Sequence, residues 1–121
     1  MKLNAFIHKH AGLMIQCFNL GHFNVYLKRD MSMKDCSMDI EVDHRYLTAS
    51  IRYGKKVEEM WSGNERQKIL ECIAHELMHI LVSEITEKDC IGKQTKLCLH
   101  HEERVVEHIS RLALRLYQQR V

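Results

Sequence analysis

The spacing of apolar residues changes period twice along this 121-residue chain, and that change limits its fold more than any other feature. Residues 2–19 and 64–85 repeat apolar side chains at helical spacing, whereas residues 22–53 alternate apolar with polar side chains, as half-buried strands do. A helix, about three strands and further helices predict an α+β fold with a small antiparallel sheet. The chain contains no proline and no linker-like stretch, so residues 1–121 are predicted to form one domain.

A last helix is predicted from about Leu99 to Gln118, after a polar loop at residues 86–98. Its buried stripe is expected to comprise the apolar residues Val105, Val106, Ile109, Leu112, Ala113 and Leu116. The central helix is expected to begin at Asn64, because Gln67 three residues later completes the pattern of a capping box.

The composition argues against two classes of partner. The formal net charge is only +2, and the arginines of the last helix lie mostly outside its apolar stripe, so nucleic-acid binding is not expected. No run approaches the roughly 18 apolar residues of a membrane span, so no membrane association is expected. The five cysteines are scattered, without a Cys-x-x-Cys pair, which predicts reduced thiols and a cytoplasmic protein.

The segment His75-Glu76-Leu77-Met78-His79 carries the strongest chemical signal. Residues four apart on a helix share one face, so His75 and His79 can offer two imidazole nitrogens to one zinc ion. Glu76 is expected beside a water molecule whose pKa zinc lowers towards about 7. A carboxylate in that position can take the proton and later deliver it to a leaving amine.

A catalytic zinc ion usually has three protein ligands, so one more ligand is expected from elsewhere in the chain. The start of the last helix offers four candidates, His100, His101, Glu102 and Glu103. Around the helix axis, the centre of the apolar stripe lies at a smaller angle from Glu102 than from Glu103. The residues alone therefore leave the third ligand open, and two imidazoles with a carboxylate would also suit iron or manganese.

The segment from Ala74 to Leu81 resembles the active-site helix of gluzincin-type metallopeptidases, and the segment from Glu103 to Ile109 resembles their downstream glutamate helix. The order of a helix, three strands, the motif helix and a glutamate helix is similar to that of the minimal zincins. The chain resembles in particular small phage and prophage zinc metallopeptidases of about this length. The resemblance covers most of residues 20–117.

The resemblance implies a zinc site formed by His75, His79 and Glu103, with Glu76 as the general base. Glu107, four residues after Glu103, is implied to steady a ligand histidine. Glu102 remains an alternative to Glu103 because the apolar stripe lies closer to it. His100 and His101 are alternatives because SprT-like peptidases use a third histidine.

Peptidases of this kind usually bind their substrate as an added strand along a sheet edge, and the strand at Tyr46–Tyr53 is the expected edge. A donor that stabilises the oxyanion is also expected, and the candidates are His44, Tyr46, Tyr53 and His108. The predicted function is zinc-dependent hydrolysis of a protein or peptide substrate in the cytoplasm, which would be the host cytoplasm for a phage-encoded chain. The alternative is a zincin-fold binding or regulatory module with little activity, and the oligomeric state stays open.

Overall fold

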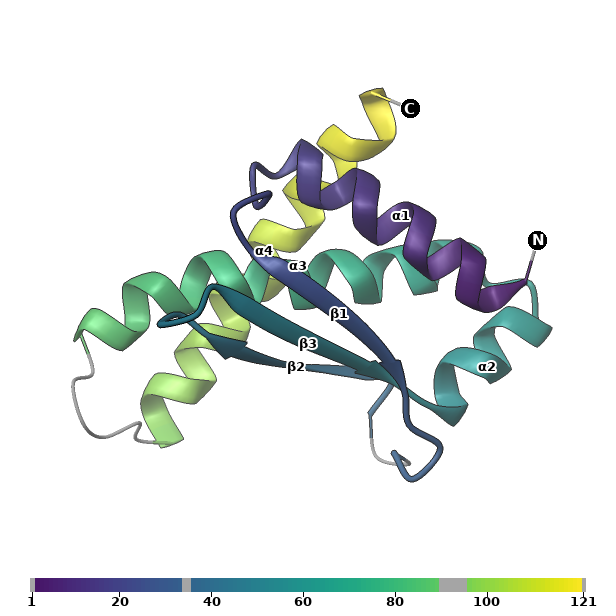
Figure 1. Cartoon of the computed structure of the whole chain (residues 1–121), viewed down its shortest axis with the longest axis horizontal. Helices are drawn as coiled ribbons and strands as arrows, with labels where there is room; N and C mark the ends of the chain where they lie inside the picture. The colour runs from purple at the N-terminus through teal and green to yellow at the C-terminus, as the bar shows by residue number, and fades with distance from the viewer. Residues whose placement is uncertain (1, 34–35, 90–95, 121) are drawn as a thin grey trace.

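Figure 1 shows the computed structural model of the chain, which describes residues 2–33, 36–89 and 96–120, with the side chains of 84–101 left out. The described residues form an α+β fold with a three-stranded sheet, as the change of period predicts, and with four helices, one more than predicted. In chain order the elements are α1 (Leu3–Cys17), β1 (Asn24–Arg29), β2 (Met38–Asp43), β3 (Thr48–Tyr53), α2 (Lys55–Ser62), α3 (Arg66–Asp89) and α4 (Lys96–Arg120).

The sheet has the strand order β1-β3-β2 and is mixed, so the prediction of an antiparallel sheet is wrong for one of its two pairings. β2 and β3 are antiparallel, with Ile40 opposite Ile51, whereas β1 runs parallel to β3, with Leu27 opposite Ile51. An alternating pattern determines which side chains share a face, and it is the same for both strand directions. The predicted substrate edge at Tyr46–Tyr53 is also wrong, because β3 is the central strand.

One face of the sheet packs on the helices and the other faces solvent. In β3, Ala49 and Ile51 are buried, whereas Arg52 points to the outer face and forms an ion pair with Asp39 of β2. α3 lies across the buried side of the sheet (Figure 1) and packs against α1, α2, α4 and β2. The motif helix is therefore the centre of the core, as its wide apolar face predicts.

The start of the motif helix differs from the prediction. A helix that the sequence analysis did not predict, α2, precedes it, and this helix is only eight residues long. α3 then begins at Arg66, because Asn64 adopts a left-handed backbone with φ 59° and is not in the extended conformation of an N-cap. The Asn64 side chain instead accepts a hydrogen bond of 3.2 Å from Arg66 Nε. At the other end, α3 runs to Asp89 and α4 starts at Lys96, so the predicted loop at 86–98 was too long.

The buried face of α4 is turned relative to the predicted stripe. Val105, Leu112 and Leu116 are 45%, 62% and 59% exposed, so their predicted burial is wrong. Among the described side chains of α4, the buried ones are Val106, Ser110, Ala113, Leu114 and Tyr117. Apolar residues occupy two neighbouring faces of this helix, and spacing alone does not distinguish which face meets the core. Over the residues described, no helix combines the length and apolarity that a membrane span requires.

Gly54, just before α2, is required by space. A Cβ atom there would lie 2.8 Å from the carbonyl oxygen of Asp30 and 2.9 Å from the Cβ of Met33. Since both contacts involve atoms on or next to the backbone, we expect Gly54→Ala to lower the free energy of unfolding by about 1–3 kcal/mol. Gly12→Ala is the control, because nothing lies within 4 Å of a Cβ there and alanine favours a helix. Urea unfolding measures both variants, and equal stability of the two would contradict the prediction.

Candidate metal centre

His75 and His79 lie on one face of α3, one turn apart. Their ring centroids are 5.1 Å apart, and the ring planes are inclined at 75°. The side chains are 21% and 13% exposed, so both rings are partly shielded from water and still accessible. Fully buried residues on the opposite side of the helix hold this segment in the core, namely Ile73, Leu77 and Ile80.

Glu103 of α4 lies between the two rings. Its Oε2 is 3.2 Å from His75 Nε2, and its Oε1 is 2.9 Å from His79 Nε2. One ligand atom from each of the three residues can be chosen so that all lie within 4.8 Å of one another. The fold thus brings together the three residues predicted as metal ligands. His75 and Glu103 lie on different helices and are 28 residues apart in the sequence.

The second nitrogen of each ring contacts a different glutamate. His79 Nδ1 is 3.1 Å from Glu102 Oε1, and His75 Nδ1 is 3.2 Å from Glu107 Oε2. Each imidazole therefore turns Nε2 towards Glu103 and Nδ1 towards a carboxylate of its own. A histidine that binds a metal through one nitrogen usually donates a hydrogen bond from the other, often to a carboxylate. This geometry favours Glu103 as the third ligand, with Glu102 and Glu107 orienting the rings.

The donor set suits a zinc ion. Zinc binds imidazole nitrogens and carboxylate oxygens at about 2.0–2.2 Å, which places neighbouring ligand atoms of a tetrahedron roughly 3.3 Å apart. The nitrogen–oxygen separations of 3.2 Å and 2.9 Å, which involve different oxygens of Glu103, are close to that spacing, and one ligand atom from each residue lies within 4.8 Å of the other two. Three protein donors would leave a fourth position open for water or substrate. The alternative ligands His100 and His101 lie outside the described side chains.

Glu76 follows the first histidine of the motif and is only 8% exposed. Burial, together with the carboxylates of Glu103 and Asp39, raises the pKa of Glu76 to about 8. A cation held by His75 and His79 would favour the charged carboxylate and lower this pKa again. Glu76 is therefore a buried carboxyl group whose raised pKa a cation at the two histidines would lower.

The raised pKa of Glu76 predicts how the stability of the metal-free protein depends on pH. The carboxyl has an ordinary pKa of 4.5 in the unfolded chain and about 8 in the folded one. Its contribution to the free energy of unfolding is therefore fully present below pH 4.5 and is lost as the pH rises through 8. Glu76→Gln removes this titration. Without metal, we expect the variant to be more stable than wild type above pH 8 by on the order of a few kcal/mol. Urea unfolding with a chelator from pH 4.5 to 8 tests this, and a difference that does not grow with pH would contradict it.

A cleft of about 680 Å³, the strand cleft, opens between β2 and the two helices of the site. β2 is an edge strand that pairs with β3 on one side. The cleft is lined by Met38, Ile40 and Val42 from β2 and by His75, Glu76 and His79 from α3. The sheet edge next to the candidate metal site is therefore β2, whereas the sequence had favoured the strand that follows it, β3.

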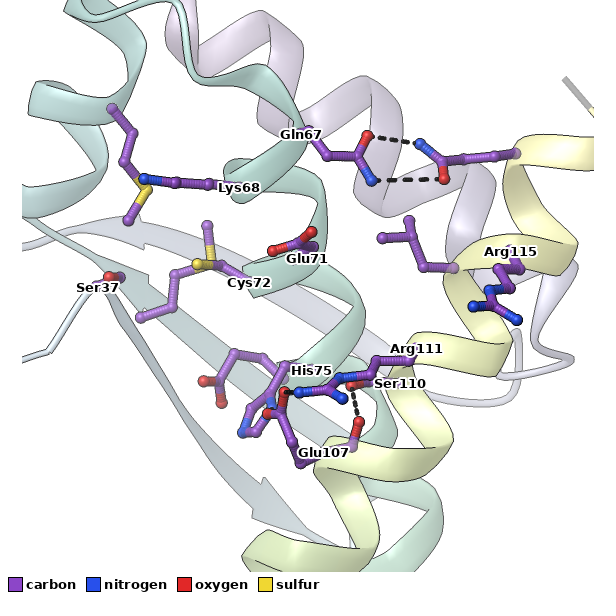
Figure 2. A pocket seen from close by; sticks show the side chains of 15 residues that line it. Ser37, Gln67, Lys68, Glu71, Cys72, His75, Glu107, Ser110, Arg111 and Arg115 are labelled. Carbon is purple, nitrogen blue, oxygen red and sulfur yellow. Dashed lines mark hydrogen bonds and ion pairs between the residues drawn. The ribbon is translucent and has the colours of Figure 1, made fainter.

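A second cleft of about 760 Å³, the helix cleft, lies between α3 and α4 (Figure 2). It shares His75 and Glu76 with the strand cleft, and Figure 2 shows His75 and Glu107 turned towards each other at that end. Gln67 and Gln118 span the two helices at the other end with hydrogen bonds of 2.7 Å and 3.5 Å. The helix cleft has no local motif in the sequence, because it forms only where two separate helices approach each other.

The described cysteines, Cys17, Cys36 and Cys72, carry free thiols, as predicted for these three positions. Burial raises the pKa of both Cys36 and Cys72. Among the described residues, neither cysteine belongs to the group whose ligand atoms converge.

The four candidate oxyanion donors lie in different surroundings. His44 Nε2 is 2.9 Å from Ser83 Oγ, and Ser83 lines the strand cleft one turn beyond the motif. Tyr53 is buried in the core, whereas Tyr46 and His108 are exposed. His44 is the candidate that the structure connects to the strand cleft.

No known protein family, curated protein or solved structure matches this chain. What characterises the protein is therefore its α+β fold with a mixed sheet and a cluster of ionisable side chains. In this cluster two histidines contact three glutamates, next to a fourth glutamate that is buried. Its function has to be inferred from the chemistry of that cluster.

Proposed function

We propose that the protein is a zinc-dependent metallopeptidase of the minimal zincin type, which hydrolyses peptide bonds in a cytoplasmic protein or peptide substrate. The observation that supports this most is the convergence of His75, His79 and Glu103 beside the buried carboxyl of Glu76. Glu103 is 58% exposed, but burying the Glu76 carboxyl beside two partly shielded imidazoles is costly unless a metal or a reaction makes use of them. The resemblance to small phage metallopeptidases belongs to the same proposal.

The proposed ligands are His75 Nε2, His79 Nε2 and a carboxylate oxygen of Glu103. When bound, zinc would supply a Lewis acid that acidifies water and polarises the carbonyl of the peptide bond. Glu76 takes a proton from the attacking water molecule and later delivers it to the nitrogen of the leaving amine. Its burial keeps bulk water from competing for that proton.

Three further residues support this chemistry in the proposal. Glu102 accepts a hydrogen bond from Nδ1 of His79, and a carboxylate oxygen of Glu107 lies 3.2 Å from Nδ1 of His75, so each carboxylate would hold its ring with Nε2 directed at the metal. His44, held by its hydrogen bond with Ser83, is the proposed donor to the oxygen that becomes negative during the attack.

The substrate is proposed to bind as an extended strand along the open edge of β2. Backbone groups of an edge strand can pair with an added strand and hold it in register. The strand cleft and the helix cleft meet at His75 and Glu76, so the chain would extend to both sides of the bond that is cut. The helix cleft runs eight residues along α3 from His75 to Gln67, about 12 Å, which accommodates roughly three or four extended residues.

Metal removal tests the proposal. Purified protein is expected to contain about one zinc ion per chain by mass spectrometry and to cleave members of a random peptide library. A chelator should abolish cleavage, and added zinc should restore it. Protein that holds zinc and cleaves no peptide would exclude the peptidase and favour a zincin-fold binding or regulatory module. Folded protein that takes up no zinc would overturn both.

A further inference from the structure

α4 carries apolar side chains on two faces, and one of these faces is open to solvent. Val105, Leu112 and Leu116 are among the most exposed aliphatic residues, at 45%, 62% and 59%. At 100° per residue, these three and the half-buried Ile109 fall within an arc of about 60°, turned roughly 100° from the buried face of the helix. We call this row of four residues the α4 seam.

The spacing of the α4 seam is that of a helix which pairs with another helix. Its members follow one another after four, three and four residues, the spacing of the a and d positions of a heptad. Helices that lie on a membrane surface have a broader apolar face, of about 100° or more, with aromatic residues, and the seam has neither property. Single exposed leucines are ordinary on a surface, but a row in heptad register indicates an interface.

The charges beside the α4 seam restrict what can pair with it. Arg104, His108 and Arg115 border the seam on its outward side, and all three are exposed. The described glutamates of α4 lie instead on the side of the helix that faces the two motif histidines. Over the side chains described, the outward border of the seam therefore carries three basic residues and no acidic one.

We propose that the α4 seam binds an amphipathic helix of a partner protein, with acidic residues on both sides of its apolar row. Leu112 and Leu116 would insert into that row, while acidic side chains of the partner would pair with Arg104 and Arg115. A second copy of this chain would place one basic border against another, which disfavours self-pairing. None of the four seam residues lines the strand cleft or the helix cleft, so the apolar contact is independent of peptide hydrolysis, whereas Arg115 also lines the helix cleft.

A designed peptide tests the proposal. The probe is a fluorescent peptide of about three heptads with leucine at a and d and glutamate at e and g, and its comparator has lysine in place of glutamate. Titration of the whole chain, followed by fluorescence anisotropy, is expected to show binding of the acidic peptide only. The double variant Leu112→Ser, Leu116→Ser should weaken binding at least about tenfold, because each buried leucine side chain contributes that much or more.

Matched variants separate the seam from other exposed residues. Met31→Ser removes an apolar side chain that is 44% exposed elsewhere, and binding should not change. Arg115→Glu should weaken binding of the acidic peptide, whereas Lys28→Glu, an exposed charge reversal on β1, should not. Circular dichroism checks that each variant is folded.

Five results would overturn the inference. Four of them are equal binding of both peptides, binding of neither, a chain that dimerises through the seam leucines in sedimentation experiments, and adsorption to vesicles of anionic lipid without binding to the acidic peptide. A double serine variant that binds the acidic peptide as well as wild type would equally exclude the seam.

Discussion

Replacement of Glu76 by glutamine is expected to reduce peptide cleavage by at least about a hundredfold while zinc stays bound. The amide of glutamine has nearly the shape of the carboxyl group, so the packing of this buried position is preserved. It cannot take a proton from water, so the general base is lost. Glu76 is not part of the group whose ligand atoms converge, and its loss should leave the metal in place. Measurements of kcat/KM and zinc content on the same preparation check both halves of the prediction.

Glu59→Gln is the matched control for this experiment. Glu59 lies on α2 and lines neither cleft, and its substitution makes the same change of charge at an exposed position. We expect this variant to keep zinc and most of its activity. Full activity in Glu76→Gln would exclude Glu76 as the general base, and loss of zinc would make it a ligand instead.

The second prediction concerns the zinc content and zinc affinity of variants in the ligand set. His79→Ala and Glu103→Ala are each expected to lose near-stoichiometric zinc, because each removes one of three converging donors. Glu102→Gln and Glu107→Gln are expected to keep zinc with roughly 10- to 100-fold weaker affinity, since each replaces the charged carboxylate beside a ligand histidine with a neutral amide. Competition with a chromogenic chelator measures these affinities on folded protein.

His108→Ala provides the control for removing a histidine, because His108 is exposed on α4 and belongs to no converging group in the described structure. Zinc should raise the melting temperature of this control and of wild type, but not of His79→Ala or Glu103→Ala. If Glu102→Gln lost the metal while Glu103→Ala kept it, the third ligand would be Glu102, as the apolar pattern of the sequence had favoured.

The sheet illustrates how far a local pattern reaches. Alternation in residues 22–53 correctly predicts three strands and the buried positions Ala49 and Ile51. It does not predict that β1 runs parallel to β3 or that β2 is the edge beside the histidines. Side-chain alternation has the same period in parallel and antiparallel strands, so strand order and direction depend on how the connections pack.

α4 illustrates a second kind of limit. Apolar residues on two adjacent faces produce one broad stripe in the sequence, and Leu112 and Leu116 look as much a part of the core as Val106. Only packing against α3 shows that Val106 is buried and that the two leucines are exposed. The same rotation of α4 determines which glutamate reaches which histidine nitrogen.

The sequence by itself determined that His75 and His79 share a face with Glu76 beside them, because the pitch of a helix follows from local backbone geometry. Only the tertiary structure decided that Glu103 lies between the two Nε2 atoms, with Glu102 and Glu107 on the outer nitrogens. These contacts join segments more than 20 residues apart, and their register depends on how side chains of α3 and α4 fit together across the core. A sequence pattern describes one helix at a time and contains no information on that fit.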